Sequence, residues 1–242
     1  NNVCEFKDVI GCRDDIMVYL IRKGLKARDA FEIMESVRKG KGLKSDWIKI
    51  MKSNNVPDWY IDSCQKIKYM FPKAHAVAYC IMAVRVGWFK INYPLHYYIS
   101  YFTLRSNAYD IDTMIKGQNA VLVRYNDIVK RSQDRELKKS VSNKEYEILN
   151  TLEVSLEMMA RGYRISNISL QYSMAEEFVI DPNDEKAIIP SFKTIDGLGL
   201  NVAKSIVAAR EERFFISKQD LLTRTQISST LLKKLDDLKV LD

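Results

Sequence analysis

The sequence predicts a mainly α-helical protein organised in three parts, over residues 1–105, 106–190 and 191–242. Two observations support this fold class. The 242 residues include only 9 glycines and 5 prolines, so few positions interrupt a helix. Apolar residues also recur at helical spacing through most of the chain. No repeat of 20 to 50 residues is found, which argues against a solenoid.

The first part contains a series of helices with recognisable ends. Acidic residues open the first helix, where they favour the positive end of the helix dipole, and glycines follow the first two helices. The next helix starts at Asp58, directly after Pro57. A strongly apolar helix ends before Pro94, which begins another. The predicted helices cover residues 14–23, 27–39, 58 onward, 74–92 and 94 onward.

The second part is a helical connector that contains a small β-hairpin. Helices are predicted over residues 111–132 and 144–161, and Gly162 closes the latter. Short apolar runs at 178–180 and 187–189 flank the sequence Asp-Pro-Asn-Asp, which is typical of a turn between two strands. The third part is predicted to be compact and helical.

Composition narrows the function classes. A chain with 47% apolar and 29% charged residues suits a folded protein, and a net charge of +7 suits a polyanionic partner. The four cysteines form no C-x-x-C pair, and the two histidines are far apart, which is poor material for a zinc site. We therefore expect free reduced thiols at Cys4, Cys12, Cys64 and Cys80.

The apolar stretch around residues 76–89 is the only candidate for a membrane span in the sequence. It is interrupted by Arg85 and is shorter than the 20 or so residues that cross a bilayer. We expect a helix buried inside the protein and no membrane contact. No signal peptide is visible, and because the chain begins with Asn1 we expect it to be a piece of a longer protein.

The sharpest local motif lies at residues 195–204. Gly197 and Gly199 stand between an apolar residue and a helical pattern. Glycines allow a tight turn that presents backbone N–H groups at a helix N-terminus, where phosphate binds well, and Lys204 follows one turn later. The alternative is an ordinary turn with a helix cap.

This motif resembles the helix-hairpin-helix motif of DNA repair and replication proteins. A second copy without glycines is predicted at residues 227–234, so the third part is expected to be a tandem helix-hairpin-helix module. The resemblance implies binding to the sugar-phosphate backbone without reading bases. The implied DNA-binding residues are Gly197, Leu198, Gly199, Asn201, Lys204, Ser228, Ser229 and Lys233.

A second candidate site combines two basic stretches. Lys73, His75 and Tyr79 lie at the start of the apolar helix, and the last two are one turn apart. The run of residues 38–42 is basic as well. If the two stretches meet, they form an electropositive pocket with an aromatic wall, suited to a nucleoside triphosphate. If the two stretches do not meet, His75 would have a structural role, and residues 38–42 would form a solvated helix end.

The blocks at residues 11–20, 35–43 and 71–85 together resemble the bacterial replicative DNA polymerase III alpha subunit, of the PolC type. The resemblance continues through Pro94-Leu95, residues 101–103 and the glycine hairpin, and so covers nearly the whole chain. It implies that residues 1–105 are a partial, fingers-like nucleotide-binding domain. The implied ligands of the dNTP triphosphate are Arg38, Lys39, Lys41, Lys73, His75 and Tyr79, with Arg13 as a further candidate.

The resemblance also implies an activity and partners. The whole enzyme is a nucleotidyltransferase that extends a primer on a DNA template, with Mg²⁺ held by aspartates of a palm domain outside this chain. No catalytic or metal-binding residue is expected here, and the chain alone is expected to be inactive. Implied partners are the primer-template duplex, dNTP, the rest of the polymerase III holoenzyme and a sliding clamp reached through a peptide beyond Asp242. The implied location is the cytoplasm.

Other features favour structural roles. Asp110 and Asp112 are carboxylates of the kind that could bind a metal ion together. No third acid joins them in the sequence, so a structural role is favoured. The aromatic side chains between Trp88 and Phe102 are expected to pack in the core. The rival functions are a non-enzymatic helix-hairpin-helix scaffold and a repair nuclease fragment.

Overall fold

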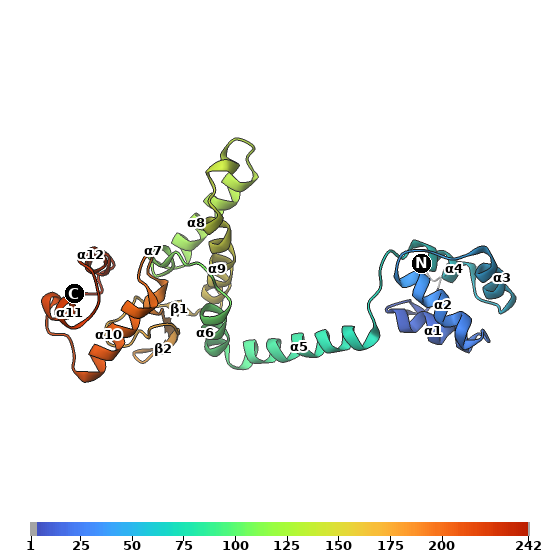
Figure 1. The fold of residues 1–242 in the computed structure, drawn as a ribbon, viewed down its shortest axis with the longest axis horizontal. Helices are drawn as coiled ribbons and strands as arrows, with labels where there is room; N and C mark the ends of the chain where they lie inside the picture. Colours follow the sequence, from blue (N-terminus) through green and yellow to red (C-terminus); the bar gives the residue numbers. More distant parts are fainter. Residues whose placement is uncertain (1–3, 242) are drawn as a thin grey trace. The chain divides into compact units, whose positions relative to one another are not determined.

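The computed structural model describes residues 4–241, and the mainly α-helical fold predicted from the sequence is confirmed (Figure 1). The contacts divide the chain into two compact units, Asn1–Gly87 and Trp88–Asp242. The division into three parts at residues 105 and 190 stays a prediction.

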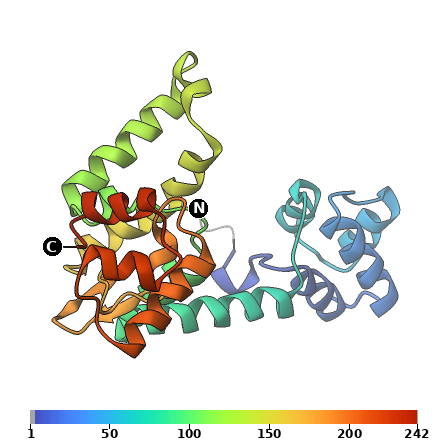
Figure 2. The same cartoon turned by 60° about the vertical axis from the view of Figure 1, so that its left-hand side comes forward.

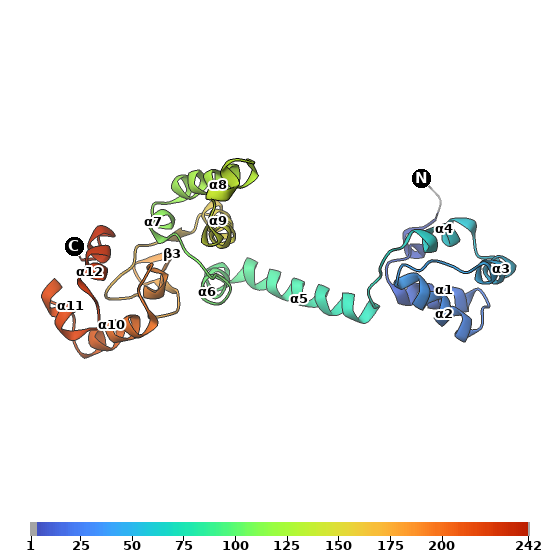
Figure 3. The ribbon, with the colours of Figure 1, turned by 45° about the horizontal axis from the view of Figure 1, so that its top comes forward.

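The first unit is built on four short helices. They are α1 (Arg13–Arg22), α2 (Ala27–Arg38), α3 (Ser45–Ser53) and α4 (Asp58–Lys66), preceded by the 3-10 helix η1 (Phe6–Asp8). Helices α1 and α2 pack side by side, and their apolar faces enclose a core with α3 and α4 (Figure 3). Tyr19 and Tyr60 stack in this core with ring centroids 4.1 Å apart.

Helix α5 (Lys73–Asn92) corrects one expectation. The sequence predicted a helix buried inside the protein, yet none of its residues is buried. Apolar side chains project all around this helix, so no single stripe can pack against a neighbour within the described chain. By length and composition alone α5 passes the test for a membrane span, with a mean hydropathy of 1.2, as a core helix of a larger protein also does.

The second unit begins with the end of α5 and continues into a helical layer. Its next helices are α6 (Pro94–Leu104), α7 (Ile111–Met114), α8 (Gln118–Gln133) and α9 (Asn143–Ala160), with the 3-10 helix η2 (Leu137–Ser140) between the last two. Helices α8 and α9 lie side by side (Figure 2). The prediction of one helix over residues 111–132 was wrong, because Gly117 has a φ of +91° and separates α7 from α8.

A small sheet packs beside these helices. Strands β2 (Val179–Asp181) and β3 (Asp184–Ile189) form the predicted antiparallel hairpin. Strand β1 (Arg164–Ile165) adds a short parallel pairing on the other side of β3, which gives the order β1-β3-β2. The sequence does not predict β1, because a strand of two residues has almost no periodic signal.

The C-terminal residues form the predicted helical module. The 3-10 helix η3 (Phe192–Thr194) precedes α10 (Leu200–Glu212), α11 (Lys218–Arg224) and α12 (Ser229–Asp237). Its buried residues belong to the same hydrophobic core as those of α6 and α9. Helices α6 and α9 therefore pack in one core with the C-terminal helices.

Some of the aromatic side chains between Trp88 and Phe102 lie in the core and others on the surface. Tyr98 and Phe102 are fully buried in the core of the second unit, as predicted, and Tyr97 and Tyr101 pack against it. The core prediction is wrong for Trp88, Phe89 and Tyr93, which are exposed. The exposed members lie on α5 or directly after it, where the described chain provides no packing partner.

Candidate phosphate-binding sites

Three basic side chains of the first unit converge on Glu35. Arg38 donates to its carboxylate through Nε at 2.5 Å and Nη2 at 3.0 Å. Lys39 Nζ lies 3.0 Å from Oε2, and Arg13 Nη1 lies 3.5 Å from Oε1. The hydrogen bonds from Arg38 and Lys39 lower the pKa of Glu35 to about 2, so this acid stays charged at neutral pH.

The segment that precedes the second basic stretch is bonded through its backbone to Arg38 and Arg13. The N–H of Met70 donates to the carbonyl of Arg38 at 3.2 Å, and the N–H of Arg13 donates to the carbonyl of Phe71 at 3.1 Å. Gly40 has a φ of +71°, and a Cβ at this position would lie only 2.4 Å from the carbonyl oxygen of Lys68. Glycine is therefore required where residues 68–70 cross the end of α2.

Lys73, the first residue of α5, contacts two acids in the first turn of α1. Its backbone N–H donates to Asp14 Oδ2 at 2.6 Å, and its Nζ lies 3.8 Å from Asp15 Oδ1. The structure thus brings together Arg13, Arg38 and Lys39 around one acid, and it anchors the segment of Lys73 to the same helix that carries Arg13.

The aromatic residues at the start of α5 form a stack. The rings of Phe71 and His75 are nearly parallel, with centroids 5.1 Å apart. The ring centroids of His75 and Tyr79 are 4.6 Å apart. The Tyr79 side chain is 66% exposed. Lys41 is also exposed and follows the turn at Gly40. The Tyr79 ring is tilted by 57° from that of His75 and remains accessible.

The glycine hairpin of the second unit has the local geometry that phosphate binding needs. Gly197 has a φ of +82°, which explains why glycine stands there. The Leu198 side chain is buried and anchors the turn. Gly199 is the N-cap of α10, and no side chain caps this helix. The N-terminal amides of α10 are therefore open to an outside acceptor.

The second hairpin differs at the same point. The Ser228 hydroxyl caps α12 by accepting from the N–H of Leu231 at 3.3 Å. Ser228 thus uses its side chain within the protein, while Ser229 and Lys233 are exposed on the first turns of α12. The helix end behind the first hairpin is therefore more open to an outside acceptor than that of the second, because no side chain caps it.

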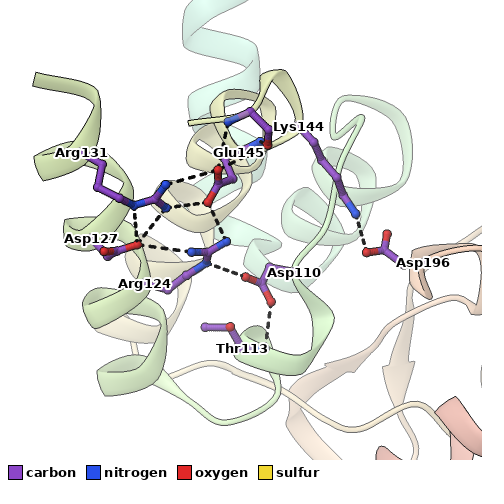
Figure 4. Close-up of polar contacts among 9 residues, drawn as sticks. Asp110, Thr113, Arg124, Asp127, Arg131, Lys144, Glu145 and Asp196 are labelled. Carbon is purple, nitrogen blue, oxygen red and sulfur yellow. Dashed lines mark hydrogen bonds and ion pairs between the residues drawn. The ribbon is translucent and has the colours of Figure 1, made fainter. Parts of the chain in front are cut away.

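Two lysines contact the residue that precedes the glycine hairpin. Lys144 of α9 forms an ion pair with the Asp196 carboxylate (Figure 4). Lys234 of α12 donates to the Asp196 carbonyl at 2.7 Å. Asn201 is exposed near the hairpin, and Lys204 pairs with Glu176 at 3.2 Å. The first hairpin is therefore linked by direct contacts to α9 and to the second hairpin.

The acids at Asp110 and Asp112 do not make a metal site. Asp110 caps α7 by accepting from the N–H of Thr113 at 3.3 Å, and it pairs with Arg124 at 3.0 Å (Figure 4). Arg124 and Arg131 both bind Glu145, whose pKa the hydrogen bond from Arg131 lowers to about 2. Within residues 4–241 no group of three His, Cys, Asp or Glu side chains could hold a metal ion. The four cysteines are free, as predicted.

Some residues of both sites were missed in the sequence. Glu35 precedes Arg38 and Lys39 by three and four positions, a helical spacing that predicts side-chain pairing. That signal could have identified the acid at the centre of the cluster. Lys144 and Lys234 left no such signal, because they lie 52 and 38 positions from Asp196 and reach it only in the folded chain.

Comparison with known proteins identifies relatives of the C-terminal hairpins and of the whole chain. A family model described as a helix-hairpin-helix motif matches residues 162–242. Proteins named DNA polymerase III PolC-type match 98% of this chain, with 55% identity in Bacillus subtilis (strain 168), 52% in Halalkalibacterium halodurans and 50% in Staphylococcus aureus (strain MW2).

The chain spans 16% of the length of these relatives. The alignments cover nearly the whole chain, and at least half of the aligned residues are identical in these three relatives. The resemblance inferred from its motifs is thereby confirmed: this chain is homologous to one segment of proteins named DNA polymerase III PolC-type.

Proposed function

We propose that this chain is the nucleotide-binding and duplex-binding portion of a replicative DNA-directed DNA polymerase. In the whole enzyme it would bind the triphosphate of the incoming dNTP and the backbone of the primer-template duplex while the primer is extended. The observation that carries this proposal is the open N-terminus of α10 behind a glycine turn, in a chain homologous to PolC-type polymerases.

The nucleotide site is proposed at the cluster around Glu35. Arg13, Arg38 and Lys39 bring three positive charges to one carboxylate, which leaves a net positive charge for a triphosphate. Lys73, His75 and Tyr79 follow on the adjoining segment, with an exposed aromatic stack for the nucleoside, and Lys41 adds charge nearby.

The DNA site is proposed at the two hairpins. Backbone amides at Gly197–Gly199 and at the start of α10 would bind one phosphate, with Asn201 and Lys204 beside it. Ser228, Ser229 and Lys233 would contact the backbone more weakly, because Ser228 already caps α12. Contacts of this kind bind DNA without regard to sequence and weaken as salt rises.

Catalysis and assembly are proposed to depend on the rest of the enzyme. The described residues do not fit a Mg²⁺ site. From the homology to PolC-type polymerases we assign the catalytic carboxylates to a palm domain outside this chain, and we expect the chain alone not to polymerise. The sliding clamp, through a peptide beyond residue 242, and the other holoenzyme subunits are the further proposed partners. A replication enzyme of this kind would act in the cytoplasm.

The duplex site can be tested by the salt dependence of binding. Fluorescence anisotropy with a labelled 20-base-pair duplex of arbitrary sequence should give an affinity that falls steeply between 50 and 200 mM salt. Two unrelated sequences should bind equally. An affinity that is independent of salt, or one that varies strongly with sequence, would contradict backbone binding.

The rival functions make different predictions. A scaffold that only joins proteins would leave duplex affinity unchanged when the glycine hairpin is altered. A nuclease fragment would cut DNA when Mg²⁺ is added. We expect the chain to bind DNA through the hairpin and to leave it intact.

A further inference from the structure

We infer that Lys144 is a positioning residue for the DNA site, which it serves by neutralising Asp196 beside the glycine hairpin. This inference rests on the proposed duplex binding at that hairpin. It assigns a role to a residue of α9, a helix outside the helix-hairpin-helix elements.

Asp196 carries a negative charge where a phosphate is proposed to bind. It directly precedes Gly197 and stands three residues before Gly199, the N-cap of α10. Its side chain is exposed, so the carboxylate stays in water rather than in the core. An uncompensated carboxylate at this position would repel a DNA phosphate.

Lys144, in the first turn of α9, reaches Asp196 with its side chain. The ammonium group pairs with the Asp196 carboxylate, and Figure 4 shows the lysine extending from the start of α9 to this acid. Lys144 and Asp196 also line two neighbouring hollows of about 390 and 510 Å³. The pair therefore borders both hollows, and Asp196 directly precedes the hairpin.

The backbone of the same residue is held separately. Lys234 Nζ donates to the Asp196 carbonyl at 2.7 Å and lies 3.8 Å from the place where a Cβ on Gly197 would be. Lys234 thus fixes the turn through a carbonyl that every residue type provides. Lys144 acts on the side chain, so its effect should depend on the charge of Asp196.

This dependence separates positioning from direct contact. If Lys144 itself touched a DNA phosphate, its removal would weaken binding whatever residue stands at position 196. It would also lower the slope of log affinity against log salt by about one charge. If Lys144 only neutralises Asp196, its removal should matter only while that acid is present.

The test is a double-mutant cycle on the full 242-residue chain with a labelled duplex at about 50 mM salt. Lys144→Gln should weaken binding about two- to fivefold, as expected for one unmasked charge near a phosphate in a watery environment. Asp196→Asn should bind as well as the parent or better. The double variant should match Asp196→Asn, and Lys144→Arg should match the parent.

Each other result has a defined meaning. Equal weakening by Lys144→Gln in both backgrounds would overturn the inference in favour of direct phosphate contact, and no weakening in either would also overturn it. Melting temperatures of the four proteins identify any loss that comes from unfolding. If the parent does not bind duplex, or if Gly199→Ser binds like the parent, the proposed hairpin site itself has failed.

Discussion

Arg38 and Glu35 form a two-point ion pair, in which Nε and Nη2 of the guanidinium donate to the two carboxylate oxygens at 2.5 and 3.0 Å. Lys39 and Arg13 reach the same carboxylate from other directions. The guanidinium is therefore held in a fixed orientation. A triphosphate would find three cations already gathered by one acid.

The first prediction concerns this guanidinium. Arg38→Ala in a full-length polymerase should lower kcat/KM for dNTP about tenfold, because a charge-assisted phosphate contact is lost. Arg28→Ala is the matched control, since Arg28 lies on the same helix, pairs with Glu32 at 3.2 Å and is 88% exposed. Steady-state kinetics check both variants, and equal effects of the two would remove Arg38 from the site.

The second prediction concerns the cap of α10. Gly199 has an ordinary φ of −70°, and a Cβ there meets no atom within 4 Å. Gly199→Ser should therefore keep or raise the melting temperature, since serine is a good N-cap. It should still weaken duplex binding severalfold, because the new hydroxyl takes the amides proposed for phosphate. Anisotropy and thermal melting measure both effects.

The second hairpin provides the reciprocal change. Ser228→Gly removes the hydroxyl that caps α12, at a cost of a few tenths of a kcal/mol in stability. Duplex affinity should change less than twofold. A large loss with Ser228→Gly and none with Gly199→Ser would reverse the assignment of the two hairpins.

The third prediction is a pH dependence of stability. Arg131 holds the pKa of Glu145 at about 2, below its ordinary value of 4.5, so the pair stabilises the fold above pH 4.5 and its contribution is lost as the pH falls towards 2. Urea unfolding should show that this contribution is about 1 kcal/mol, since the network is partly exposed to solvent. In Glu145→Gln this part of the pH dependence should disappear. A parallel acid profile in both proteins would contradict the prediction.

The fourth prediction concerns the core of the second unit. The Tyr98 hydroxyl donates to Glu157 Oε2 at 2.6 Å, and Lys90 lies 2.9 Å from the same oxygen. Tyr98→Phe should lower the free energy of unfolding by about 1 kcal/mol, through the loss of this hydrogen bond. Tyr146→Phe, on the exposed side of α9, should change it little. Urea unfolding compares the two, and equal losses would assign the effect to something other than this bond.

Much of the fold could be predicted from local sequence signals. Helix ends at Gly24, Gly40, Pro94 and Gly162 lie within a residue or two of their observed positions, because each signal acts on the backbone next to it. Gly117 lies inside an apolar pattern that continues on both sides of it. Its positive φ interrupts the helix, and the pattern alone could not indicate this.

Features that depend on distant contacts could not be predicted. The apolar sequence of α5 indicated burial, but burial requires a neighbour, and the described chain supplies none. In the candidate sites, the basic residues and glycines could be named from their types and spacing. The pairing of Asp196 with Lys144 could not, because it joins segments that only the tertiary fold brings together.

The central claim is that basic residues from two separate stretches bind one triphosphate, and amide chemical shifts of the labelled chain test it most directly. Adding a dNTP with Mg²⁺ should shift the amides of Arg38, Lys73 and His75 together, with one dissociation constant. Shifts that stay unchanged in all three, or that respond with unrelated constants, would contradict a shared nucleotide site.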